Sequence, residues 1–195
     1  PTPTRHTTYH GDRPDRVPDL GPIAATALAA SAAFMRGGAV GAPLLRIEAA
    51  EVEASGLKGV QEFADDVRHW PTVFDDDALT AALFGLGAFI EKAGTGGGLF
   101  RMLQAQGCQN IADLLGDAAA AEAAAAARHA SQAWSELAAA ATDAGTSLRS
   151  RSLAAAKIAA TIPDSETRLV EALETASRSV GTVDTGLEAY LKGYL

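Results

Sequence analysis

The residues best suited to ligand chemistry form a glycine-rich stretch near the middle of the chain, Gly94-Thr95-Gly96-Gly97-Gly98. Glycine is favoured where φ must be positive or where another group approaches the backbone closely. Gly94 is typical of a residue that ends a helix, and the glycines after it would leave free N–H groups at the start of the next helix, an arrangement that binds anions. Arg101 follows one turn later and can add a guanidinium to the same phosphate or carboxylate. The predicted substrate or anion site comprises Gly94, Thr95, Gly96, Gly97, Gly98 and Arg101.

Two other interpretations remain open for this stretch. The glycines can form a tight connection between two helices with no ligand, and Arg101 can pair with a carboxylate such as Glu91 and so lock two helices together. A dinucleotide-binding loop is excluded, because such a loop follows a β-strand and the residues before Gly94 have a helical pattern.

The other residues that could act as nucleophiles or metal ligands do not form a recognisable catalytic or metal-binding site. Cys108 is the single cysteine, has no adjacent histidine, and is predicted to be a buried structural residue. His6 and His10 are four residues apart, but nearby prolines argue against the helix that would bring them together on a metal. The acidic run Asp75–Asp77 is explained by capping at a helix start. We therefore expect no metal and no cofactor, and the catalytic residues stay unknown.

Composition limits the compartment and the partners. The 195 residues carry a formal net charge of −8, which disfavours binding to nucleic acid or to an anionic membrane. One cysteine cannot form an intramolecular disulfide and suits a reducing compartment. No apolar run reaches the roughly 18 residues of a membrane span. We therefore expect an acidic cytoplasmic protein.

Hydrophobic periodicity predicts helices along most of the chain, and strand signals are nearly absent. Residues 1–18 are rich in Pro, Arg, His, Asp and Thr without periodicity, and are predicted to be an extended arm or linker before a single helical domain at residues 19–195. The fold class predicted is an all-α bundle of about seven to nine helices with an irregular N-terminal arm. The predicted helices cover residues 19–35, 57–70 with a stop at Pro71, 76–93, 99–106, 110–115, 117–142, 148–160, 163–180 and 182–195.

Three motifs carry a resemblance to a known family. They are Lys92 to Arg101 (KAGTGGGLFR), Gly59 to Ala64 (GVQEFA) followed by His69-Trp70, and Ala133 to Leu137 (AWSEL). Over roughly residues 19–160 the chain resembles the helical, DUF4872-like C-terminal region of proteins similar to the butirosin biosynthesis acyltransferase.

The resemblance implies a bacterial natural-product enzyme that passes an acyl group from a carrier-protein thioester to an amine. It also implies that the nucleophile and base belong to an N-terminal portion, and that Cys108 occupies a position where the family more often has an aromatic or apolar residue. The expected partners are therefore an N-terminal catalytic portion and an acyl carrier protein, with this chain covering substrate or docking the carrier. The alternative is a non-catalytic helical interaction or oligomerisation module that forms a homo-oligomer.

Overall fold

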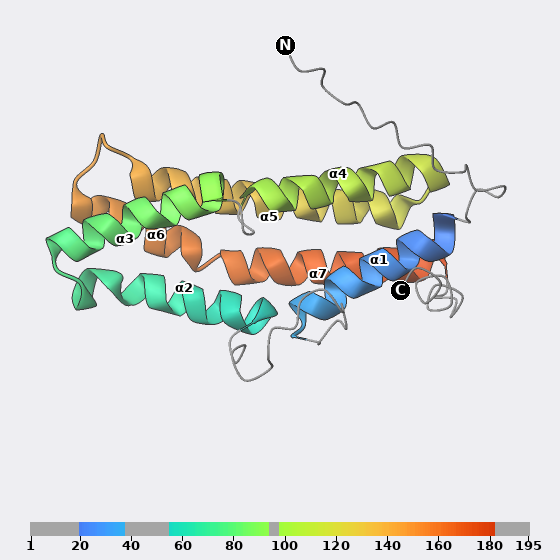
Figure 1. The fold of residues 1–195 in the computed structure, drawn as a ribbon, viewed down its shortest axis with the longest axis horizontal. Coiled ribbons are helices and arrows are strands. Elements are labelled where there is room, and N and C mark those ends of the chain that lie inside the picture. The colour runs from blue at the N-terminus through green and yellow to red at the C-terminus, as the bar shows by residue number, and fades with distance from the viewer. Residues whose placement is uncertain (1–19, 38–54, 94–97, 182–195) are drawn as a thin grey trace, which may run out of the picture.

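The computed structural model describes residues 20–37, 55–93 and 98–181, which form an elongated bundle of helices (Figure 1). These residues contain no strand, so the all-α class is confirmed for the part of the chain described. None of the helices described is long and apolar enough to cross a membrane. The predicted arm at residues 1–18 and the predicted helix at 182–195 lie outside the described residues. The elements are α1 (Leu20–Met35), α2 (Gly56–Val73), α3 (Asp76–Ala88), the π-helical turn η2 (Phe89–Ala93), α4 (Gly98–Leu115), α5 (Ala118–Thr142), α6 (Leu148–Ala159) and α7 (Ile162–Val180).

The alanine-rich helix α5 forms the axis of the bundle, and α3, α4, α6 and α7 all pack against it. Alanine has the highest intrinsic helix propensity, and its small side chain allows neighbouring helices to approach closely. The helix covers nearly the whole of the predicted range 117–142, and five alanines of its first half are completely buried. Asp117 caps the helix by accepting a hydrogen bond from the backbone N–H of Ala120 at 2.7 Å.

Two clusters of buried apolar side chains lie along α5. The first joins α1, α4, α7 and the N-terminal half of α5, and includes Leu28, Cys108 and Leu173. The second joins α2, α3, α6 and the C-terminal half of α5 around Leu83 and Leu137. Because α5 contributes to both clusters, it holds the two ends of the bundle in one arrangement.

The helix after Asp75 follows its prediction closely. The Asp75 carboxylate accepts a hydrogen bond from the backbone N–H of Ala78 at 2.8 Å, which is the predicted N-cap. The predicted apolar stripe is buried from α3 into η2, since no member is more than 8% exposed. Its members are Leu79, Leu83, Leu86 and Ile90.

Two helix boundaries differ from the prediction. Residues 99–106 and 110–115 were expected to be separate helices divided near Gly107, but α4 runs through Gly107 without a break. One exposed glycine costs a helix only about 1 kcal/mol, and Ala105 and Cys108 hold this face against α5. This merger lowers the helix count, and the described residues contain seven α-helices, fewer than the upper end of the expected range of seven to nine. The other difference is at Pro71, which lies inside α2 and does not end it. Proline removes only its own N–H donor, and the N–H of Phe74 still donates to the Trp70 oxygen at 3.0 Å.

Candidate functional site

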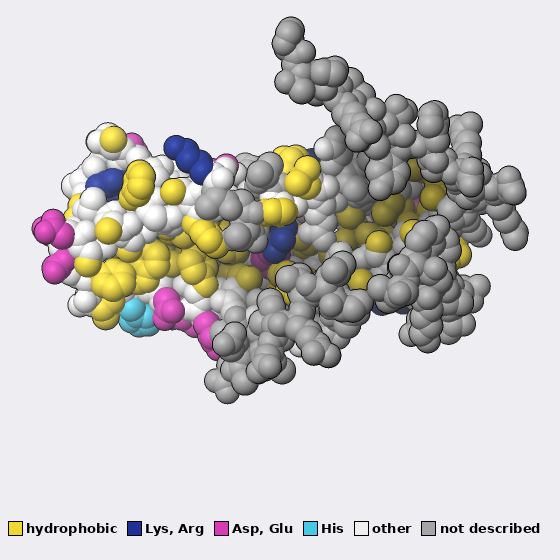
Figure 2. Space-filling view, viewed as in Figure 1, with side chains coloured by type: hydrophobic (Ala, Val, Ile, Leu, Met, Phe, Trp, Pro, Cys, Tyr) yellow, Lys and Arg dark blue, Asp and Glu magenta, His cyan; other side chains and the backbone are white. Residues whose placement is uncertain are grey.

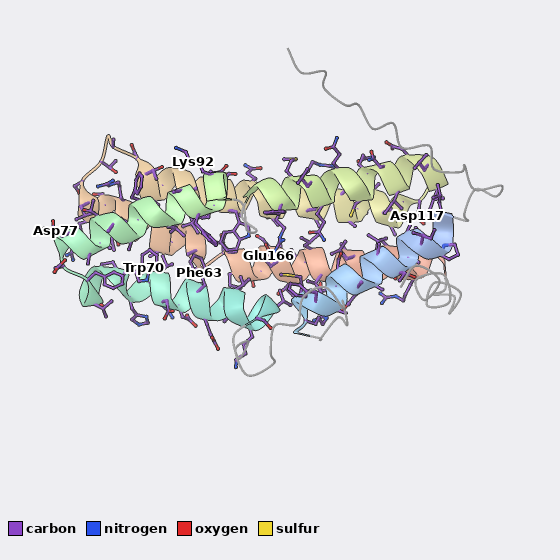
Figure 3. All side chains as sticks on the ribbon, viewed as in Figure 1. Phe63, Trp70, Asp77, Lys92, Asp117 and Glu166 are labelled. Carbon is purple, nitrogen blue, oxygen red and sulfur yellow. The ribbon has the colours of Figure 1, made fainter. Side chains whose placement is uncertain are left out.

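The side chain of Arg101 turns into the bundle and binds a buried carboxylate. Its Nε donates to both carboxylate oxygens of Glu166, at 2.8 Å to Oε1 and 3.0 Å to Oε2. The indole Nε1 of Trp134 donates to the same Oε1 at 2.6 Å. Glu166 is completely buried at the middle of the molecule (Figure 3). We call Arg101, Trp134 and Glu166 the Glu166 hub, which ties α4, α5 and α7 together.

The surroundings of the hub explain how a charge is tolerated there. A buried carboxylate is costly unless an opposite charge and hydrogen bonds compensate for the lost water, and Glu166 receives both. The Arg101 side chain is 15% exposed, and its Nη2 lies 3.7 Å from the sulfur of Met35 in α1. The ring of Phe63 in α2 packs 5.6 Å from that of Trp134. Arg101 therefore does join two helices through an ion pair, as one of the two alternative interpretations predicted. Its partner, however, is Glu166 and not Glu91.

Glu91 instead takes part in a contact of η2 and Gly98 with α5. The hydroxyl of Ser135 donates to Glu91 Oε1 at 2.7 Å, and the hydroxyl of Ser131 donates to the carbonyl oxygen of Gly98 at 2.6 Å. A Cβ atom at Gly98 would lie 2.3 Å from Ser135 Oγ and 3.3 Å from the backbone oxygen of Ser131. Gly98 is thus required because another helix approaches the backbone closely.

The predicted anion site is only partly within the described residues. Gly98 and Arg101 share the first turn of α4, but the Arg101 guanidinium is directed onto Glu166. Gly94, Thr95, Gly96 and Gly97 lie outside the described residues. Anion binding at this turn stays a prediction.

Cys108 has the properties of a structural cysteine. It is 2% exposed, forms no disulfide, and packs in the first core cluster. Burial raises the pKa of its thiol above the usual value, because the charged thiolate loses its hydration. A thiol held neutral in this way is a poor nucleophile at neutral pH. Elsewhere in the described residues, no group of three or more His, Cys, Asp or Glu side chains can hold a metal ion.

Exposed apolar side chains flank the connection between η2 and α4, and sequence reasoning missed them. We call Phe89, Phe100, Met102 and Leu103 the junction residues; they are 53%, 42%, 48% and 54% exposed. A signal was present, because Phe89 lies outside the stripe formed by Leu86 and Ile90. Apolar side chains also gather along the face shown in Figure 2. Exposed apolar side chains that form a contiguous patch are typical of surfaces that bind another molecule.

Comparison with known proteins places the chain in a family. No curated protein and no solved structure matches this chain. The model of a family described as a domain of unknown function, DUF4872, matches residues 1–173, which extends from the N-terminus into α7. This match covers far more than half of the chain, so the protein belongs to the DUF4872 family.

Proposed function

We propose that this chain is the helical accessory part of an acyltransferase-like enzyme and docks onto a separate catalytic portion through its junction residues. In that position it covers the substrate or holds the carrier protein while the acyl group passes from thioester to amine. The exposure of Phe89, Phe100, Met102 and Leu103 around one connection is the observation that carries the proposal.

Two groups that could act as a nucleophile or base are already occupied in the described part of the molecule. Cys108 is buried in an apolar core, and the carboxylate of Glu166 is neutralised by Arg101. Neither side chain is accessible to a substrate as a nucleophile or base. Catalysis would therefore come from outside these residues, as the resemblance to the butirosin acyltransferase implies.

The chemistry of the junction residues fits a protein partner. Phenylalanine and methionine are enriched in the centres of protein interfaces, and charged residues surround them at the rim. Lys92, labelled in Figure 3, is an exposed residue of η2 three positions after Phe89 and provides such a charge. Burial of apolar area contributes about 25 cal/mol per Å², so these four side chains favour association once a complementary surface is present.

The experiment adds the full chain in trans to the polypeptide encoded directly upstream in its reading frame. The readout is acyl transfer from a pantetheine thioester to an amine. We expect saturable stimulation, and we expect Phe89→Ser and Leu103→Ser to raise the concentration for half-maximal stimulation roughly tenfold each, since loss of a buried interface anchor costs over 1 kcal/mol. Leu153→Ser is the control, because Leu153 on α6 is as exposed as Leu103, at 54%. Absence of stimulation, or an equal effect of all three variants, would reject the proposal.

The same variants distinguish the alternative function. If the chain acts as an oligomerisation module, sedimentation velocity of the full chain alone will show dimers or larger species, and Phe89→Ser will convert them to monomers. Self-association of this kind, together with no stimulation of acyl transfer, would favour the interaction module over the accessory part of an enzyme.

A further inference from the structure

A groove of about 380 Å³ lies at the end of the bundle where α3 faces the end of α5 and the start of α6. Its walls include Asp77, Thr80 and Phe84 from one face of α3, Thr142 from α5 and Arg151 from α6. Figure 3 shows Asp77 at this end of the molecule, well away from Glu166. The volume is within the range of small-molecule sites. The groove shares no residue with the Glu166 hub or the junction residues.

The guanidinium of Arg151 is the unusual feature of this groove. Its Nε is buried and has no hydrogen-bond partner, and within the described residues its side chain forms no ion pair. A buried donor without an acceptor costs free energy, since the hydrogen bond to water is lost and nothing replaces it. A planar guanidinium matches the two oxygens of a carboxylate. A carboxylate in the groove would give the guanidinium of Arg151 an ionic partner, which the described residues do not provide.

The other polar groups of the groove present acceptors. The hydroxyl of Thr80 donates to the backbone oxygen of Asp76 at 2.7 Å, and that of Thr142 donates to the backbone oxygen of Ala138 at 2.8 Å. Because both hydroxyls already donate to carbonyl oxygens of their own helices, they can only accept hydrogen bonds from a ligand. A ligand group with several N–H donors, such as an ammonium, satisfies this requirement.

The charged side chains of the groove restrict the class of ligand further. Asp77 and Arg151 both line the groove, and no ion pair joins them within the described residues, so the groove has one negative and one positive side chain. Such a site disfavours a dianion such as a phosphate monoester and favours a molecule that carries both charges. Phe84 is 70% exposed and adds an aromatic surface for an apolar group.

We infer that this groove binds a free amino acid with an apolar side chain. Its carboxylate lies on Arg151, its ammonium on Asp77, and its side chain against Phe84. This site would operate whether or not the chain docks onto a catalytic portion, so the inference is independent of the proposed function.

The test is a titration of the full chain, followed by amide chemical shifts, with L-phenylalanine, phenylacetate and phenethylamine. Concentrations up to about 10 mM detect dissociation constants in the millimolar range. We expect saturable shifts with phenylalanine, and roughly tenfold weaker binding of the two analogues, each of which lacks one charged group. Equal binding of phenylacetate and phenylalanine, or no saturable shift with phenylalanine, would overturn the inference.

Variants locate the site. Arg151→Gln and Asp77→Asn should each weaken phenylalanine binding roughly tenfold, because each removes one charge-assisted contact. Arg149→Gln is the matched control, since Arg149 is an exposed arginine two residues away on α6, and it should bind as the wild type does. The two test variants lie on different helices, so a folding defect in one leaves the other informative. Wild-type affinity in both would contradict the inference.

Discussion

Replacing Arg101 with methionine removes the positive charge from the Glu166 hub and leaves the carboxylate buried with one hydrogen bond, from Trp134. Methionine keeps most of the aliphatic length of arginine, so the change is mainly electrostatic. Glu166 has no exposed surface and α7 is packed on both α1 and α5, which prevents the carboxylate from reaching water.

The expected loss of stability follows from this geometry. Removing one partner of a buried ion pair costs about 3–5 kcal/mol, because the remaining charge is uncompensated. For a domain of this size each kcal/mol lowers the melting temperature by about 2–4 °C, so Arg101→Met should lower it by roughly 6–20 °C. Arg168→Met on the same helix as Glu166 is the control, and this exposed arginine should change stability by less than about 0.5 kcal/mol.

A double variant separates the ion pair from ordinary packing. In Arg101→Met with Glu166→Met both charges are absent, and the remaining cost is the unpaired indole N–H of Trp134, about 1–3 kcal/mol. The double variant should therefore be more stable than Arg101→Met alone. Urea unfolding monitored by helical circular dichroism at equilibrium gives the free energies, and the cycle gives the coupling. If the changes in unfolding free energy of the two single variants simply add up to that of the double variant, then Arg101 and Glu166 do not stabilise each other. The ion pair would then not be the interaction that stabilises the Glu166 hub.

Three further predictions concern single side chains. Gly98→Ala should lower the free energy of unfolding by about 1–3 kcal/mol, because its Cβ would overlap Ser135. Gly107→Ala has open space around it and should raise the free energy of unfolding by up to about 1 kcal/mol. Urea unfolding should therefore show changes of opposite sign for the two variants. Cys108 should react with iodoacetamide at pH 8 far more slowly than glutathione does, because its raised pKa and burial keep it neutral and covered, and fast labelling of the folded protein would contradict this. Ser152→Ala should leave stability unchanged or raise it by about 1 kcal/mol, since the Ser152 hydroxyl is buried without a partner; a clear loss in thermal unfolding would show that the hydroxyl is bonded.

Local signals in the sequence were sufficient for most of the helices in the described residues. The Asp75 cap and the stripe from Leu79 to Ile90 lie within a few turns of each other, and the alanine run of α5 predicts its own helix. The continuity of α4 was missed because it depends on packing against α5, which outweighs the weak helix propensity of Gly107.

The hub could not be predicted from local signals, since Glu166 and its partner Arg101 are 65 residues apart. Glu91 is the nearer carboxylate in the chain, but the close approach of Gly98 to α5 directs it to Ser135. A partial signal existed, because Glu166 precedes Leu169 and Leu173 on the same helical spacing and so belongs to the buried face of α7. An acidic residue on such a face requires a compensating partner, but its spacing does not say which one.

The Glu166 hub and the contact of Gly98 with α5 together hold the start of α4 from two sides. Arg101 anchors its first turn to α7, while Gly98 and Glu91 anchor the same turn and η2 to the serines of α5. The junction residues Phe100 and Leu103 extend from a helix end that is held in this way, so little conformational freedom remains to be lost when a partner binds. The ion pair therefore bears on docking as well as on stability. Arg101→Met should weaken stimulation of the catalytic portion under conditions in which the variant is still fully folded.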